Sequence, residues 1–256
     1  MGILRTKKLK TLLDGWQPGT VMTSARLKSL GITPQHVQKY VASNWVEPLG
    51  NGAFKRPSET LTWQGALHSL QTQLSLKVHV GALTALLDEG GAHYARPGRE
   101  QIFLFAGAGV ALPKWFREYP WPDRISLTQT KLLPPDLGVR ETMVSGFSLR
   151  TSAPERAILE ALHLSPKDID LVEVFQILEG LRTLRPKLMQ SLLEACGSFK
   201  VKRLFLHMAE RAALPVLTHL DSDTITLGKG DRTLTAGGVY VARYGLILPK
   251  ELVHRE

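Results

Sequence analysis

The chain has 256 residues, a formal net charge of +9 and 43% apolar residues. This length suffices for one large domain or two ordinary ones, and the apolar content is that of a globular protein with a buried core. No apolar run reaches the roughly 18 residues of a transmembrane helix, and the basic first residues lack the apolar segment of a secretory signal. A single cysteine, Cys196, excludes an internal disulfide and thiolate zinc sites, and we read it as a small buried thiol. We therefore expect a cytoplasmic protein that does not bind a membrane.

The positive charge is concentrated in the first quarter of the chain. Residues 1–60 contain nine Lys and Arg against three Asp and Glu, whereas the remaining residues contain 23 against 20. Two thirds of the net charge therefore lies in the first 60 residues. Such a concentration of positive charge is typical of a segment that binds nucleic acid.

Three short helices are predicted in this basic segment. The first covers residues 4–13, for which a frayed basic arm is the alternative. The second covers residues 24–30 and can be capped by Thr23. Gly31 then supplies a tight turn, and Thr33 followed by Pro34 is a cap with a first-turn proline, which begins the third helix. The pattern indicates a helix-turn-helix.

A β-hairpin is predicted directly after the third helix. Residues 45–49 and 53–56 form two extended runs that are joined by Gly50-Asn51-Gly52. Asn-Gly is a strong hairpin signal, because a type I′ turn requires two residues with positive φ. Together with the helices, this hairpin predicts a winged helix-turn-helix, although an ordinary helical pair with a hairpin is the alternative.

The outer side of the third helix carries residue types that read DNA. One side of this helix follows the spacing of a buried apolar stripe, which consists of Val37, Tyr40 and Val41. The opposite, outward side then carries Gln35, Gln38 and Lys39. Glutamine pairs with adenine, and lysine reaches guanine or a phosphate. We predict that Gln35, Gln38 and Lys39 read base edges and that Arg26, Lys28, Lys55 and Arg56 contact phosphates. The full set of candidate DNA contacts is Ser24, Arg26, Lys28, Gln35, His36, Gln38, Lys39, Ser43, Lys55 and Arg56.

Beyond a hinge at residues 57–60, the pattern predicts a mixed α+β chain without internal repeats. A capping box is expected at Ser152 and Glu155. Helices are predicted at residues 63–74, 82–87, 154–162, 169–181, 186–196 and 201–213, and strands at residues 77–80, 102–105, 124–127, 142–149, 224–227, 232–235 and 239–248.

No catalytic or metal-binding motif is identified in the sequence. Gly107-Ala108-Gly109 follows a strand, but the third glycine of a dinucleotide loop is replaced by Leu112, so we interpret it as a turn. Asp221-Ser222-Asp223 resembles a metal-binding D-x-D but lacks the preceding phosphate loop, and we interpret it as a helix-to-strand turn. The histidines have no metal-ligand spacing. We expect no cofactor, no metal and no enzymatic activity.

A second basic cluster occurs in the C-terminal half. A solvated charged face is the favoured interpretation, and a second nucleic-acid or partner surface is the alternative. The cluster consists of Arg182, Arg185, Lys187, Lys200, Lys202 and Arg203.

The chain resembles the AbiEi family of abortive-infection antitoxins from type IV toxin–antitoxin systems. The resemblance rests on the number and order of five stretches, which are WQPGTVMTSARLKSLGITPQHVQKYVASNWVEPLGNGAFKRP, VHVGALTALLDEGG, LRTSAPERAILEAL, LEGLRTLRPKLMQSLLEACGSFKVKRLFLHMAE and GGVYVARYGLILP. It implies a winged helix-turn-helix domain at residues 1–60, with a boundary as late as about residue 93, followed by a larger mixed α/β antitoxin domain at residues 61–256. Family DNA contacts carry over onto Ser24 and Arg26, residues 35–39, and Lys55 and Arg56.

The resemblance implies binding to inverted repeats of double-stranded operator DNA and repression of the protein's own operon. It also implies that the C-terminal domain opposes a co-encoded nucleotidyltransferase toxin without a stable complex. A monomer bound twice to the repeat, with or without cooperativity, and a weak dimer both remain open. Two alternatives are an RNA-binding protein that covers tRNA ends with its C-terminal basic surface, and an enzyme that reverses the toxin's modification.

Overall fold

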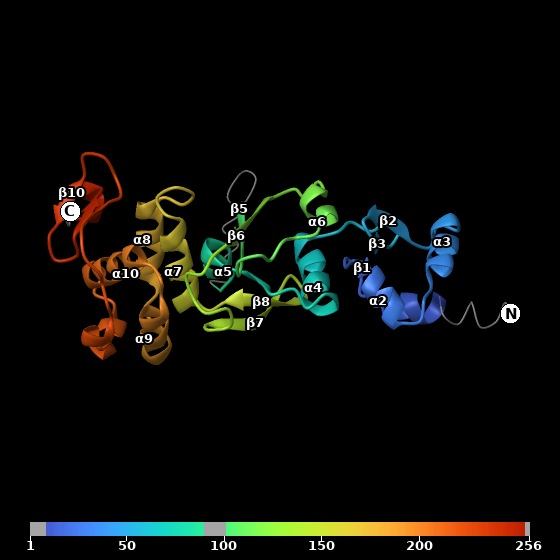
Figure 1. Ribbon diagram of the computed structural model, residues 1–256, viewed down its shortest axis with the longest axis horizontal. Coiled ribbons are helices and arrows are strands. Elements are labelled where there is room, and N and C mark those ends of the chain that lie inside the picture. Colours follow the sequence, from blue (N-terminus) through green and yellow to red (C-terminus); the bar gives the residue numbers. More distant parts are fainter. Residues whose placement is uncertain (1–8, 90–100, 254–256) are drawn as a thin grey trace. The chain divides into compact units, whose positions relative to one another are not determined.

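The computed structural model describes residues 9–89 and 101–253 and divides into two compact units (Figure 1). The first unit comprises Met1–Val78, Gly109–Ile125 and Glu141–Arg150, and the second comprises His79–Ala108, Ser126–Arg140 and Thr151–Glu256. Both units are therefore built from segments that are separated in the sequence. The fold is α+β, as predicted, with a winged helix-turn-helix at the N-terminus.

The N-terminal part of the first unit is a small helical core closed by a three-stranded sheet. After a helix at residues 9–14, its elements are β1 (Met22–Thr23), α2 (Ser24–Ser29), α3 (Pro34–Ala42), β2 (Glu47–Gly50) and β3 (Ala53–Lys55). The strand order is β1-β3-β2. Leu12, Trp16, Leu27, Ile32 and Tyr40 form the centre of this core, and all are at most 7% exposed. The described part of the first predicted helix is therefore a packed helix and not a frayed arm.

Helix α4 (Trp63–Gln73) follows the winged region and supports it. Thr62 caps the helix as predicted, because its hydroxyl accepts from the Gly65 amide at 3.2 Å. The Gln73 side chain accepts from the Thr23 amide at 2.9 Å and donates to the Val21 carbonyl at 2.6 Å. The amide of Gln73 thus holds β1 against α4.

A five-stranded sheet has the strand order β6-β5-β4-β8-β7. Its strands are β4 (Val78–Val80), β5 (Gln101–Ala106), β6 (Arg124–Gln129), β7 (Val139–Val144) and β8 (Phe147–Ser152), and the helices between them are α5 (Ala82–Glu89) and α6 (Lys114–Glu118). Strands β4 and β8 pair in parallel, with Val80 opposite Thr151. The sheet therefore joins strands that are about 70 residues apart in the sequence.

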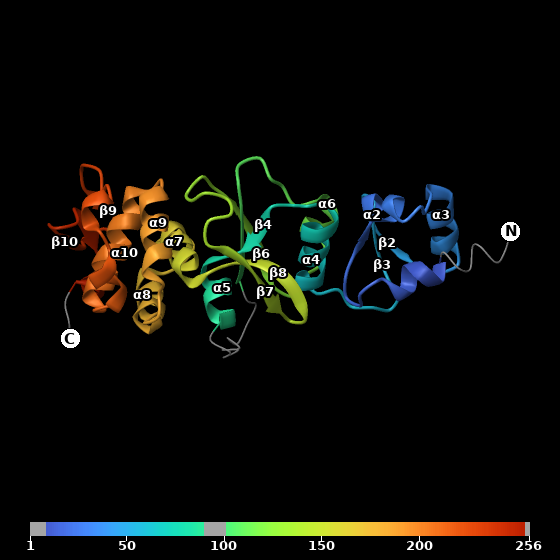
Figure 2. The ribbon, with the colours of Figure 1, turned by 90° about the horizontal axis from the view of Figure 1, so that it is seen from below.

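The second unit contains a group of helices around α7 (Pro154–Leu164). Helices α8 (Leu171–Gly180), α9 (Pro186–Ala195) and α10 (Phe199–Arg211) all contact α7, and Figures 1 and 2 show these four helices together. Short 3-10 helices η1 (Pro215–His219), η2 (Ser222–Thr224) and η3 (Lys250–Leu252) accompany a small sheet with the order β10-β11-β9. The strands of this sheet are β9 (Arg232–Thr233), β10 (Val239–Val241) and β11 (Leu246–Leu248).

Glu160 on α7 is a buried residue of the second unit that accepts four hydrogen bonds. Its buried carboxylate accepts from His79 Nε2 at 2.8 Å, Arg156 Nε at 2.7 Å and Ser152 Oγ at 2.7 Å, and from the Ala82 amide at 3.2 Å. Burial raises the pKa of this carboxyl, but His79 and Arg156 more than offset the effect, so the pKa lies below its ordinary value. A buried charge with this many partners fixes the arrangement of the elements that supply them.

Four sequence predictions differ from the structure. Residues 142–149 are not one strand, since a turn at Ser145 and Gly146 separates β7 from β8, and residues 239–248 likewise contain two strands. Residues 224–227 are not a strand, because η2 ends at Thr224 and residues 225–227 have no regular secondary structure. Ser152 does not cap α7, because its hydroxyl donates to Glu160 while Glu155 binds Arg185.

Candidate nucleic-acid interface

Both helices of the helix-turn-helix begin at the predicted caps. The Thr23 hydroxyl accepts from the Arg26 amide at 3.2 Å, which starts α2. Thr33 accepts from the His36 amide at 3.4 Å, and His36 Nδ1 accepts in return from the Thr33 amide at 3.3 Å. This reciprocal pair is a capping box in which histidine replaces the usual Glu or Gln. The second helix of the motif is therefore fixed at its N-terminal end, where base contacts are made in this class of motif.

The wing is a short antiparallel hairpin that is attached to α2. Glu47 pairs with Lys55 and Pro48 with Phe54 across β2 and β3. Asn51 has φ +49° and Gly52 has φ +75°, so the predicted turn with two positive φ angles is confirmed. The Ser24 amide donates to the Gly52 carbonyl at 2.7 Å. Ser24 therefore lies at the junction between α2 and the wing tip.

The outer side of α3 presents four exposed polar residues, Gln35, Gln38, Lys39 and Ser43. Their side chains make no hydrogen bond or ion pair within residues 9–89 and 101–253. Tyr40 is buried on the opposite side, while Val37 and Val41 are half-buried. The structure thus places Gln35, Gln38 and Lys39 where the periodicity of the sequence predicts them.

His36 differs from these residues. Its ring is half-buried, lies 3.0 Å from the Thr33 hydroxyl and stacks on Tyr40 with a centroid distance of 6.3 Å. The ring is therefore part of the capping box, which accounts for its position without a base contact.

Val37 and Val41 are half-buried because they border an open apolar groove. The groove has a volume of about 930 Å³ and lies between α2, α3 and the wing. Leu27, Ile32 and Phe54 complete its apolar lining, and Lys28 and Gln38 also border it. Lys28 on α2 and Gln38 on α3 therefore border the same surface.

The cations of the wing are bound within the domain, which sequence reasoning did not foresee. Lys55 Nζ lies 3.0 Å from Glu47 Oε2 and donates to the Glu59 carbonyl at 3.3 Å. Arg56 Nη1 donates to Glu59 Oε1 at 3.2 Å, and its Nη2 donates to the Leu13 carbonyl. Both side chains are mostly buried. The predicted phosphate contacts of Lys55 and Arg56 would require these ion pairs to open.

Arg26 and Lys28, by contrast, are exposed and unpaired within the described residues. They lie on different sides of α2, because Lys28 borders the apolar groove whereas Arg26 lines a polar pocket next to α4. The exposed unpaired cations of the helix-turn-helix helices are therefore Arg26, Lys28 and Lys39 among the residues that the structure describes.

The second basic cluster is not a continuous solvated surface. Lys202 and Arg203 are only 4% and 5% exposed, and Arg203 donates to the carbonyls of Leu227, Gly228 and Gly230. Lys200 Nζ donates to the carbonyls of His163, in the last turn of α7, and Ser165, just after it, and burial lowers the pKa of its ammonium group. These three cations serve as internal donors, which corrects the interpretation of the cluster as an exposed face.

The remaining three members of the cluster, Arg182, Arg185 and Lys187, are exposed. Arg185 forms a bidentate pair with the buried Glu155, with distances of 3.0 and 2.9 Å. This pairing lowers the pKa of Glu155 although burial alone raises it. Arg182 donates to the Ala212 carbonyl at 2.9 Å. The sequence gives no signal for these two pairings, because Glu155 and Ala212 each lie 30 residues from the arginine that they bind.

The motifs that were rejected in the sequence have structural roles. Residues 107–109 form a turn after β5. Asp221 caps the 3-10 helix η2, where a helix-to-strand turn was predicted. Cys196 is a buried free thiol at the end of α9, and burial raises its pKa. Among the described residues, no group of three His, Cys, Asp or Glu side chains is placed to hold a metal, and no helix is long and apolar enough to cross a membrane.

The comparisons with known proteins agree with a winged helix-turn-helix regulator. Residues 5–96 match the model of the N-terminal domain of the AbiEi antitoxin, a transcriptional regulator, and residues 99–249 match the model of the AbiEi antitoxin of type IV toxin–antitoxin systems. The chain belongs to the AbiEi antitoxin family. The resemblance found in the sequence is thereby confirmed over nearly the whole length of the chain.

The AbiEi fold is also similar to a solved structure. The RV2827C protein from Mycobacterium tuberculosis has 14% sequence identity and a TM-score of 0.61, and the match covers 97% of this chain and 92% of that protein. At this identity the likeness concerns the fold alone. No curated protein sequence matches the chain.

Proposed function

We propose that this AbiEi-family regulator represses its own operon by binding inverted repeats in the promoter. The observation that carries the proposal is the outer side of α3, whose N-terminal end is fixed by the capping box. There Gln35, Gln38 and Lys39 are exposed and have no partner in the described part of the chain. Glutamine is a residue type that pairs bidentately with adenine in the major groove, which is the role proposed for Gln35 and Gln38. Lys28 supplies a cation for a phosphate contact, and Lys39, which the sequence predicts at a base edge, can also reach a phosphate.

The wing has a positioning role in this proposal. Because Lys55 and Arg56 are held by Glu47 and Glu59, their charge is largely neutralised within the domain. The wing then orients α2 through the Ser24–Gly52 backbone hydrogen bond and contributes little to the phosphate attraction.

The experiment is a binding assay with the full chain, the DNA upstream of its gene and a scrambled sequence, at two salt concentrations. Specific protection that persists at the higher salt supports the proposal. Gln35→Ala should then reduce the preference for the operator by about 1–3 kcal/mol with little effect on scrambled DNA. Equal and strongly salt-dependent binding to both DNAs would contradict it, since non-specific binding is mainly electrostatic.

We further propose that the protein counteracts a co-encoded nucleotidyltransferase toxin without forming a stable complex with it. The family of the chain supports an antitoxin role, and the partner class comes from the sequence resemblance. Co-expression of the full chain with the neighbouring toxin gene should restore growth, while the two proteins should separate on size-exclusion chromatography. A stable co-eluting complex, or no rescue of growth, would contradict the proposal.

A further inference from the structure

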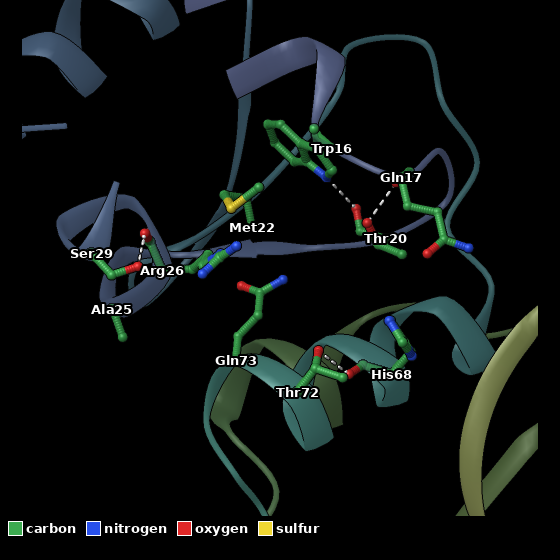
Figure 3. Close-up of a pocket in the computed structure, with 11 residues that line it drawn as sticks. Trp16, Gln17, Thr20, Met22, Ala25, Arg26, Ser29, His68, Thr72 and Gln73 are labelled. Atoms are coloured by element: carbon green, nitrogen blue, oxygen red, sulfur yellow. Dashed lines mark hydrogen bonds between the residues drawn. The ribbon is translucent and has the colours of Figure 1, made fainter. Parts of the chain in front are cut away.

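A polar pocket of about 380 Å³ lies within the first unit, between α2 and α4 (Figure 3). Ala25, Arg26 and Ser29 line it from α2, and His68, Thr72 and Gln73 line it from α4. Trp16, Gln17, Thr20 and Met22, from the segment that precedes α2, close it together with Gly15. This volume lies at the small end of the range for ligand pockets in proteins.

Arg26 gives the pocket its charge. Figure 3 shows the Arg26 side chain extending from α2 toward the space that Gln73 and His68 also border. The guanidinium makes no hydrogen bond or ion pair within the described residues, and the pocket lining contains no Asp or Glu. An unpaired guanidinium in a concave polar site without carboxylates is suited to binding an oxyanion.

The walls of the pocket are held in place without a ligand. Trp16 Nε1 donates to the Thr20 carbonyl at 3.1 Å, and the Val21 amide donates to Ser69 Oγ of α4 at 2.9 Å. Gln73 bridges Val21 and Thr23, and Thr23 in turn caps α2. A preformed site of this kind loses little conformational freedom when it binds a ligand.

His68 adds a second polar group. Its Nδ1 lies 2.9 Å from the Ser148 carbonyl, which can only accept, so Nδ1 carries the proton and Nε2 remains available to a ligand. The hydroxyls of Ser29 and Thr72 donate to carbonyls of their own helices, at 2.8 and 2.7 Å. Arg26 is therefore the main group in the pocket that lacks a partner among the residues that the structure describes.

We propose that this pocket binds a small molecule that carries a phosphate group, with Arg26 as its principal contact. A phosphate could come from such a free molecule or from the backbone of bound DNA, and we assign it to the free molecule. The reason is that Arg26 lines the side of α2 next to α4, whereas Lys28 borders the groove shared with α3. The inference does not depend on operator recognition, because ligand binding is measured without DNA.

The test uses the full chain in calorimetric titrations with AMP, ADP, GDP, glucose 6-phosphate and inorganic pyrophosphate, up to millimolar concentrations. Adenosine and glucose serve as phosphate-free controls. We expect saturable binding of at least one phosphorylated compound and none of its phosphate-free counterpart. If none of the five phosphorylated compounds binds saturably, the inference is overturned.

Variants then connect binding to the pocket. Arg26→Gln should weaken binding at least about tenfold, because a charge-assisted contact is lost. Lys10→Gln removes one exposed charge of the same unit outside the pocket lining and should leave binding unchanged. Ala25→Phe changes no charge but fills the pocket from an exposed helix position, and it should also abolish binding. Equal losses in Arg26→Gln and Lys10→Gln would show a general charge effect and overturn the inference.

A separate experiment tests whether Arg26 contacts a phosphate of the DNA backbone. If Arg26 contacts the DNA backbone instead, Arg26→Gln should flatten the salt dependence of DNA binding by about 0.9 unit. That result, together with no binding of the phosphorylated compounds, overturns the inference. An unchanged salt slope with lost small-molecule binding supports it. Circular dichroism and melting of each variant confirm that it is folded.

Discussion

The backbone amide of Ser24 donates to the carbonyl of Gly52 at 2.7 Å, which joins the first residue of α2 to the tip of the wing. Gly52 has φ +75°, and a Cβ at this position would lie 2.8 Å from the Ser24 hydroxyl. The contact therefore depends on glycine both for its backbone conformation and for the space next to Ser24.

Substitution of Gly52 should destabilise the first unit. Gly52→Ala places an L side chain in the left-handed region, which costs about 1–2 kcal/mol, and displaces the Ser24 hydroxyl. In a Ser24→Ala background, the new Cβ at position 52 would contact only the Cβ at position 24, at an ordinary distance of 3.4 Å. The cost of Gly52→Ala should then be smaller by about 0.5 kcal/mol or more. Urea unfolding of the four proteins checks this, and strictly additive effects would contradict it.

The cations of the helices and of the wing should differ in their effect on DNA binding. Lys39→Gln and Lys28→Gln should each reduce the slope of log affinity against log salt by about 0.9, because each removes one phosphate contact. Lys55→Gln should leave this slope nearly unchanged, because Lys55 is paired with Glu47. Affinities across a salt series measure the slopes. A flattening in Lys55→Gln as large as that in Lys39→Gln would show that the ion pair opens on DNA.

The capping role of His36 can be separated from base recognition. His36→Ala should lower stability by about 1 kcal/mol, since the Thr33 amide loses its acceptor. His36→Gln should retain most of the stability, because glutamine is a usual residue at this position of a capping box. Thermal melting compares the variants. If His36→Ala instead leaves the melting temperature unchanged and alters the preference for the operator, the ring contacts a base.

The Glu160 network should dominate the stability of the second unit. Glu160→Gln removes the charge that balances Arg156 in the interior, and breaking a buried pair in this way costs about 3–5 kcal/mol. Glu179→Gln, at an exposed position of α8, should change stability by less than about 0.5 kcal/mol. Denaturant unfolding measures both. Similar small effects of the two substitutions would contradict the assigned role of Glu160.

The stability of the second unit should fall on mild acidification. Burial lowers the pKa of His207 below its ordinary value of 6.5, against the opposing effect of the Leu252 carbonyl, and burial lowers the pKa of His163 as well. Below pH 6.5 the unfolded chain therefore takes up protons that the folded chain does not, so stability is lost as the pH falls toward the folded pKa values.

His207→Gln tests this pH dependence. The glutamine amide can still donate to the Leu252 carbonyl, as His207 Nε2 does at 2.9 Å, but it does not titrate. Melting temperatures measured from pH 7 down to about pH 5 should decrease less in His207→Gln than in the wild type. Parallel decreases in the two proteins would exclude His207 as a source of the effect.

Elements with local signals could be predicted from the order of the residues. Thr23, Thr33 and Pro34 fix the starts of α2 and α3, and Asn51-Gly52 fixes the hairpin, because caps and turns involve residues that are two to four positions apart. The period of α3 likewise predicted which side of the helix is exposed. The order of these local signals was sufficient to predict a winged helix-turn-helix and the resemblance to the AbiEi family.

The partners of the charged side chains, by contrast, could not be predicted without the folded structure. Lys55, Arg56, Lys202 and Arg203 read as exposed cations in the sequence, but all four side chains are mostly buried in the structure. Lys55 pairs with Glu47 across the wing, whereas Arg56 and Arg203 donate to carbonyls of distant segments. Ser152 also has a capping pattern for α7, but its hydroxyl binds Glu160, which lies farther along that same helix. Burial and long-range pairing depend on which distant segments pack together, and a charged residue carries no local signal of that packing. Arg26, Lys28 and Lys39 are available for ligands because they have no partner within residues 9–89 and 101–253.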